Sequence, residues 1–205
     1  AAAPAPYGLG SGQFELAAPD VRIGPSDNPV RLAAARLVGQ VGSTASGIAG
    51  TFEGGTGRIG SVPLDLTEIG GRWRFAGGKL SVDGALRVAD TEPEMRFKPL
   101  IGQDVKLVLA NGRIEATGVL VQPERQARVA TVVIRHDLSS AAGQADFKVD
   151  GLRFGAATQP DDLTPLALGV IANVDGPVTG DGRINWSGTG VARTAGAEAR
   201  GVGAQ

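Results

Sequence analysis

Hydrophobic and polar residues alternate along most of this chain, most clearly between Gly70 and Asp90. In that stretch one side carries Trp73, Phe75, Leu80, Val82, Leu86 and Val88, whereas the other carries arginine, lysine, serine and aspartate. A period of two is typical of strands with one apolar and one solvated face. Glycines at 77, 78 and 84 fall where the chain can reverse, because glycine reaches positive φ without steric cost. We therefore predict three short antiparallel strands here.

The same alternation recurs about every ten residues along the chain. Further strands are predicted at 13–18, 21–23, 47–52, 58–66, 105–110, 113–121, 128–136, 144–154 and 176–186. The segment 30–41 fits a helical turn or a strand, and its context favours the strand. Asn111-Gly112 lies between two alternating runs and predicts a tight hairpin. Strands at this spacing, without helices between them, indicate a mostly β, antiparallel architecture.

One segment, residues 162–173, departs from the alternation and predicts a short amphipathic helix. Thr164 suits the N-cap and Pro165 the first helical position. Leu166, Val170 and Ile171 then share one stripe, which we expect to pack against the sheet.

Composition removes several classes of function. The 20 basic and 21 acidic residues are mixed along the chain and leave a net charge of −1, so no basic stripe is available for nucleic acid. The absence of cysteine removes disulfides and thiolate chemistry. No apolar run approaches the roughly 20 residues of a membrane helix. The chain begins at Ala1 without a methionine or a leader, which fits a processed product or an excised segment of a longer protein, and we favour the excised segment.

Candidate catalytic motifs all have plainer interpretations. The G-x-G-x-x-G match at 55–60 is followed by Ser61-Val62-Pro63 rather than by a helix, so turn glycines explain it better than a dinucleotide site. His136 is the only histidine, and a strand-end residue is the default interpretation. Asp161 and Asp162 suit a helix start, and the Asn185 glycosylation sequon lies inside a predicted strand. We expect no enzyme, no cofactor and no metal site.

The apolar side of the strands leaves two alternatives. A second layer can cover it in a closed sandwich, which composition favours, or part of it can stay open as a groove.

A resemblance to a known family changes that balance. The segments VPLDLTEIGGRWRFAGGKLSVDGALRVAD (62–90), FKPLIGQDVKLVLANGRIEATGVL (97–120), VATVVIRHDLSSAAGQADFKVDGLRF (129–154) and LTPLALGVIANVDGPVTGDGRINWSG (163–188) together resemble the YdbH-like proteins. These belong to the AsmA-like and TamB-like group of Gram-negative envelope proteins. The resemblance implies a curled antiparallel sheet that forms an elongated, aliphatic groove, as part of a longer protein anchored in the inner membrane and extended through the periplasm.

The implied partner is the acyl chain of a phospholipid carried towards the outer membrane. The lipid-facing residues would be Trp73, Phe75, Leu80, Val82, Leu86, Val88, Val105, Leu107, Leu109, Ile114, Phe147 and Val149. Burying about fifteen methylenes at roughly 0.8 kcal/mol each gives on the order of 12 kcal/mol, of which an open groove recovers part. The expected segments are a linker at 1–12, the β-groove at 13–158, the helix at 159–176, and closing strands with a flexible tail at 177–205. Open sheet edges also allow edge-to-edge self-association.

Overall fold

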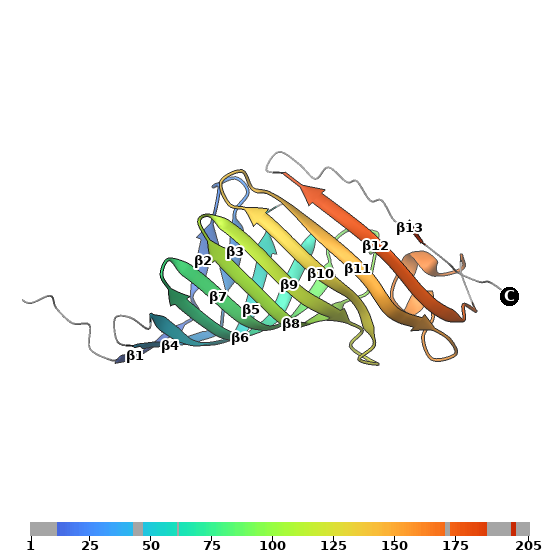
Figure 1. Cartoon of the computed structure of the whole chain (residues 1–205), viewed down its shortest axis with the longest axis horizontal. Helices are drawn as coiled ribbons and strands as arrows, with labels where there is room; N and C mark the ends of the chain where they lie inside the picture. Colours follow the sequence, from blue (N-terminus) through green and yellow to red (C-terminus); the bar gives the residue numbers. More distant parts are fainter. Residues whose placement is uncertain (1–11, 43–46, 61, 171–172, 188–197, 200–205) are drawn as a thin grey trace, which may run out of the picture.

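The strands of this protein form one antiparallel sheet (Figure 1). The computed structural model describes residues 12–42, 47–60, 62–170, 173–187 and 198–199 of the chain. The strands are β1 (Gly12–Ala17), β2 (Asp20–Ile23), β3 (Val30–Ala33), β4 (Arg36–Val41), β5 (Ile48–Ile59), β6 (Leu64–Ala76), β7 (Lys79–Asp90), β8 (Leu100–Ala110), β9 (Arg113–Val121), β10 (Arg128–Asp137), β11 (Ala142–Phe154), β12 (Gly176–Trp186) and β13 (Glu198–Ala199). The predicted mostly β, antiparallel class is confirmed.

From β4 onward, neighbouring strands in the sheet are also neighbours in the sequence. The sheet forks at its N-terminal end, because β4 pairs with the first half of β5 and β3 pairs with the last four residues of β5. The chain between the two halves bends at Gly54, which has a φ of 63°. Neither β1 nor β2 pairs with β12 or β13, so the sheet is open.

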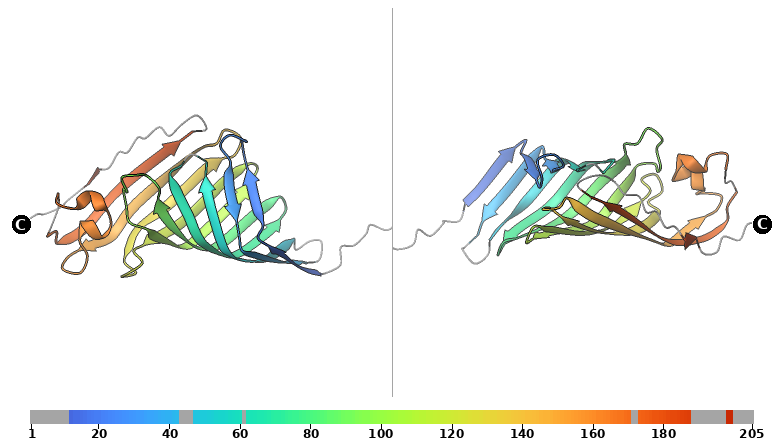
Figure 2. Two further views of the ribbon diagram at one scale, coloured as in Figure 1. Left: turned by 180° about the vertical axis from the view of Figure 1, so that it is seen from behind. Right: turned by 90° about the horizontal axis from the view of Figure 1, so that it is seen from above.

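Extra residues bend the strands near their middles. The strand register shifts where β5, β6, β8 and β11 each carry one residue more than the strand opposite. At these shifts Gly54, Glu68, Asp104 and Gly151 have left-handed backbones, with φ of 63°, 52°, 51° and 94°. Such β-bulges increase local twist and bend a strand. The sheet consequently curls along its length: β2, β3 and β5 lie behind β8–β10 in Figure 1, and the reverse view in Figure 2 shows the enclosed side.

The turn between β2 and β3 meets the opposite part of the curled sheet. A Cβ atom at Gly24 would lie 3.3 Å from the carbonyl oxygen of Leu138, which is in the β10–β11 turn. The two turns are close in both views of Figures 1 and 2 (left). This is a contact between turns, so it partly bridges the curl without adding a ladder of strand hydrogen bonds.

The prediction of three short strands between Gly70 and Asp90 is wrong. Gly77 and Gly78 do form a turn, with φ of 58° and 73°. Gly84, however, lies inside β7 and pairs with Gly71 of β6. A Cβ atom at Gly84 would lie 2.2 Å from the Gly70 carbonyl oxygen, so this glycine permits close strand approach and not a reversal. The stretch therefore belongs to two long strands.

The predicted amphipathic helix at 162–173 is also wrong. In the described part of this segment the chain forms two 3-10 turns, Pro160–Asp162 and Pro165–Ala167. Thr164 does act as an N-cap, since its hydroxyl accepts a hydrogen bond from the Leu166 amide. The α-helix fails because the Leu163 carbonyl accepts from Lys98 of a distant connection, 2.7 Å away, and Gly169 has a φ of 73°.

Candidate functional site

One face of the sheet is apolar across its whole width, and we call it the apolar face. Cross-strand pairing places one row of side chains from β1 to β12 side by side: Phe14, Gly39, Gly50, Trp73, Val82, Leu107, Ala116, Ile134, Ala145 and Ile184. The next row consists of Val41, Ile48, Phe75, Leu80, Leu109, Ile114, His136, Gly143 and Trp186. Paired residues in antiparallel strands point to the same face.

The same pairing places all twelve sequence-predicted residues on the apolar face. Trp73, Val82 and Leu107 belong to the first row, and Phe75, Leu80, Leu109 and Ile114 to the second. Val105 pairs directly with Gly84, and Phe147 pairs directly with Val132, so both lie on this face in a third row. Leu86, Val88 and Val149 follow at the same parity along β7 and β11. The sequence therefore located this face correctly, although what covers it is a separate matter.

In the described part of the chain all strands belong to one sheet, so no second sheet covers the apolar face. Among the described residues, no large side chain is less than 2% exposed. Four large side chains of this face, Leu16, Val21, Leu32 and Phe75, are 38–49% exposed. A closed sandwich would bury such residues, since their transfer from water is the main gain of folding.

The Trp73 side chain of β6 reaches across β5 to β4. Its indole Nε1 donates a hydrogen bond of 3.2 Å to the Val38 carbonyl of β4, two strands away. Its ring centroid is 6.3 Å from that of Phe14. The Phe14 ring in turn covers Gly39, where a Cβ atom would lie 2.3 Å from a ring carbon. The small residues thus let the two aromatic rings line this part of the face.

Buried residues concentrate at one rim of the apolar face. Here the long β7–β8 connection (91–99) meets the β11–β12 connection, whose residues 155–170 we call the strap. Lys98 donates its amide to Leu163 of the strap at 2.7 Å, and the Thr164 hydroxyl donates to the Arg96 carbonyl. The buried apolar residues nearest this rim are Val88, Leu100, Val121, Ala130, Leu152 and Phe154.

An ion pair fixes the β7–β8 connection. The Asp90 carboxylate has no exposed surface and accepts two bonds of 2.7 Å from the Arg96 guanidinium. It also accepts from the Arg96 and Glu92 amides, at 2.8 and 3.1 Å. Burial alone would raise the pKa of Asp90, but these hydrogen bonds lower it to about 2. The carboxylate is therefore charged at neutral pH and holds the connection against the end of β7.

A second set of polar contacts joins the strap to the β9–β10 connection. The Arg125 guanidinium donates to Asp162 at 3.0 Å and to Thr158 at 3.1 Å. Gln159 of the strap donates to the carbonyl of Gly155, where the strap begins, and to the carbonyl of Val174, which follows the strap. The strap is therefore held by three separate parts of the chain.

The residues predicted to pack on the sheet do not do so where the structure describes them. Leu166 is 58% exposed and Val170 is 77% exposed. Ile171 lies outside the described residues. The residue that is buried in this part of the strap is Ala167, at 5% exposure. The stripe was assigned with helical periodicity, and the 3-10 turn points different side chains inward.

His136 of β10 lies on the apolar face, two strands from β12. Trp186 of β12 reaches across Gly143 of β11 and donates its Nε1 hydrogen to His136 Nδ1 at 3.1 Å. Both side chains are 7% exposed. Burial lowers the pKa of His136, against the opposing effect of the Asp137 charge. A neutral imidazole that accepts an indole hydrogen is a packing arrangement, with no nucleophile beside it in the bonds described.

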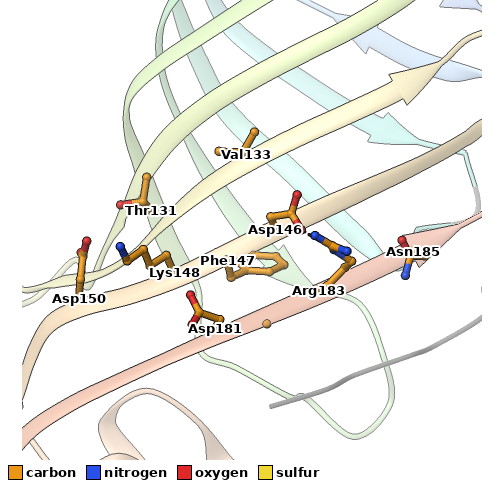
Figure 3. Close-up of a pocket in the computed structure, with 10 residues that line it drawn as sticks. Thr131, Val133, Asp146, Phe147, Lys148, Asp150, Asp181, Arg183 and Asn185 are labelled. Carbon is orange, nitrogen blue, oxygen red and sulfur yellow. Dashed lines mark hydrogen bonds and ion pairs between the residues drawn. The ribbon is translucent and has the colours of Figure 1, made fainter. Parts of the chain in front are cut away.

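The opposite face is polar and carries cross-strand ion pairs. Lys106 pairs with Asp83 at 3.2 Å, and Asp146 accepts from both Arg183 and Arg135. A shallow hollow of about 920 Å³ lies over β10–β12, and the charged side chains of Figure 3 surround it. Phe147 also borders this hollow, although its pairing with Val132 places its side chain on the apolar face. The charged lining of the hollow is unsuited to an acyl chain, because burying unpaired charge is costly.

The remaining motifs do not form a catalytic site. The G-x-G-x-x-G match begins inside β5, so no helix N-terminus follows it. In the parts of the chain that the structure describes, no three His, Asp or Glu side chains gather to hold a metal ion. Within the same parts, no helix has the length and apolarity that crossing a membrane requires.

Comparison with protein families settles the lineage. A family model described as "YdbH-like: Intermembrane phospholipid transport protein YdbH" matches residues 5–205. The chain belongs to the YdbH-like family. The resemblance found in the sequence is thereby confirmed, and the description of the YdbH-like family names a transport protein and not an enzyme. Comparison with curated proteins and with solved structures gives no significant match.

Sequence reasoning missed two features around the face of this YdbH-like chain. The strap was mistaken for a helix, because its main partners, Arg96 and Lys98, are more than sixty residues away. The bulges were also missed, although the alternation does change phase at Asp104: Leu100 and Gly102 precede it, and Val105 and Leu107 follow it on the same face.

Proposed function

We propose that this chain is a segment of a protein that carries phospholipid between membranes, with the acyl chains lying in a groove formed by the apolar face. The observation that supports the proposal best is the continuous row from Phe14 to Ile184, which crosses a sheet that no second sheet covers in the part of the chain that the structure describes. An apolar surface this wide is unfavourable in water and indicates a ligand or partner. The family description agrees with a phospholipid as that ligand.

The chemistry of the face suits movement better than tight capture. Its side chains are mostly Val, Leu, Ile and Ala, and hydrophobic attraction has no preferred direction. An acyl chain lying along the rows therefore exchanges one aliphatic contact for another as it moves from strand to strand. Selective pockets use several convergent polar groups. Here His136 is such a polar group in the second row, and Trp186 already bonds to it.

We also propose a wider setting, which the description of an intermembrane transport protein supports. The proposed whole protein is longer than this chain, is anchored in the inner membrane of a Gram-negative bacterium, and extends through the periplasm. In this arrangement the edge of the sheet at β1, and the part of β12 outside its two residue pairs with β13, are the positions where further strands continue the groove. In an isolated segment the same edges favour association between copies.

Site-specific photocrosslinking tests the proposal. Leu107 and Val108 are neighbours in β8 whose side chains lie on opposite faces, because Leu107 pairs with Val82 and Val108 with Ser81. A photoreactive amino acid at position 107 is expected to crosslink to phospholipid in cells, whereas one at position 108 is expected not to. Equal labelling from both positions, or none from either, would contradict the proposal.

A further inference from the structure

The strap carries three aliphatic side chains that project into solvent. Leu166, Leu168 and Val170 are 58%, 73% and 77% exposed, and together they form what we call the tip, residues 165–170. Ala167, between them, is 5% exposed and faces the protein. Large aliphatic side chains gathered this way on a soluble surface mark an interaction site more often than chance placement does.

The tip is held in this outward position by its backbone. Hydrogen bonds of 3.0–3.2 Å join backbone groups within the tip and to Thr164. The Thr164 hydroxyl donates to the Arg96 carbonyl, and Leu163 accepts from the Lys98 amide, so the base of the tip is tied to the β7–β8 connection. The aliphatic side chains are thus displayed by an ordered turn.

The composition of the tip favours hydrocarbon as its partner. From Leu163 to Val174 the sequence contains no charged residue and no aromatic residue. Protein interfaces take most of their binding energy from Trp, Tyr and Arg, none of which is present in this stretch. An uncharged aliphatic turn can enter a lipid layer without desolvating a charge.

The location of the tip connects it to the apolar face. Figure 2 shows the strap on the same side of the sheet as β2 and β3, the side that the curl encloses. The strap borders the rim where the apolar face ends at Leu100 and Phe154. A lipid layer in contact with the tip would therefore be next to that face.

The geometry points to the tip as a docking element that inserts into the surface of a phospholipid bilayer, beside the rim through which an acyl chain passes to or from the apolar face. The role of the rim rests on the proposed function, but the insertion of the tip does not. Because the attraction is hydrophobic, binding to a bilayer with no net charge is expected to persist when the salt concentration is raised.

Flotation with phosphatidylcholine vesicles tests the inference. The wild-type protein is expected to float with the vesicles, and the Leu168→Asp/Val170→Asp variant to lose at least tenfold in bound fraction. Both side chains are mostly exposed, so the variant should keep the fold, which circular dichroism checks. Leu168→Ser/Val170→Ser is a second variant that removes the aliphatic side chains without adding charge. The matched control, Gln40→Glu/Thr117→Glu, adds the same charge on the polar face and is expected to float like the wild type.

The outcomes separate the two proposals. Equal flotation of the wild type and both tip variants would overturn the inference, as would release of the wild type by salt alone. Photocrosslinking from position 107 in the tip variant reports on the apolar face independently. A wild type that floats through its tip but gives no lipid crosslink at position 107 would refute the proposed function and leave the docking role standing.

Discussion

Truncation of two phenylalanines on the same face distinguishes an open apolar surface from a protein core. Phe75 lies on the apolar face beside the β6–β7 turn and is 46% exposed, whereas Phe154 lies beside the strap and is 8% exposed. Replacing a buried phenylalanine by alanine typically costs about 3–5 kcal/mol, of which part is the cavity that remains. Phe154→Ala is therefore expected to lower the free energy of unfolding by that amount.

Phe75→Ala should cost much less in the lipid-free protein. Only a little over half of its surface is covered, and truncation opens the site to water instead of leaving a cavity, so we expect about 1 kcal/mol. Urea unfolding followed by circular dichroism measures both values, provided that the denaturant slope is unchanged. A Phe75→Ala cost of about 3 kcal/mol or more would refute the reasoning, because it would mean that protein packs over this part of the face.

Three further predictions concern stability. Because its pKa is lowered to about 2, Asp90 contributes about 2 kcal/mol to the free energy of unfolding above its ordinary pKa of 3.8, and this contribution is lost as the pH falls towards 2. Unfolding measured at a series of acidic pH values should show this loss, and Asp90→Asn should abolish it while destabilising the protein by about 3 kcal/mol at neutral pH. Because the pKa of His136 is lowered, the free energy of unfolding is expected to have its full value above the ordinary pKa of 6.5 and to decrease as the pH falls below 6.5, with a parallel change in Trp186 fluorescence. His136→Gln should abolish this pH dependence, and a variant with the same pH dependence would exclude His136 as its cause. Glu68→Gly relieves a left-handed backbone and is expected to raise the unfolding free energy by up to about 1 kcal/mol, whereas Glu115→Gly, in a regular part of β9, should lower it by about 1 kcal/mol; thermal melts that rank the two variants in reverse would contradict this.

Local pattern was sufficient to predict the strands and the apolar face. Alternation depends only on neighbouring residues, and Asn111-Gly112 has the positive φ values, 51° and 72°, that a tight hairpin requires. The sequence was therefore sufficient to predict the β8–β9 hairpin and the shared face of Val105, Leu107, Leu109 and Ile114.

Features that depend on contacts between distant parts of the chain could not be predicted from the sequence. Thr164 and Pro165 begin a helical turn as their chemistry indicates, but the Lys98 amide takes the Leu163 carbonyl and the helix does not continue. Gly84 has the composition of a turn residue, yet its role is to let β7 approach Gly70 and Gly71. Whether the apolar side was open or covered also depended on the whole sheet, since alternation describes one strand at a time.

The line of bulges has a consequence for how such a chain can change length over evolution. Inserting or deleting one residue in a regular strand exchanges the faces of every residue beyond it, so the apolar row would turn outward. At Gly54, Glu68, Asp104 and Gly151 the strand already holds one residue more than its neighbour. Deleting a residue there keeps both halves facing as before and removes only a bend. Single-residue length variation at these positions is therefore a route by which relatives can alter the curvature of the sheet while preserving its two faces.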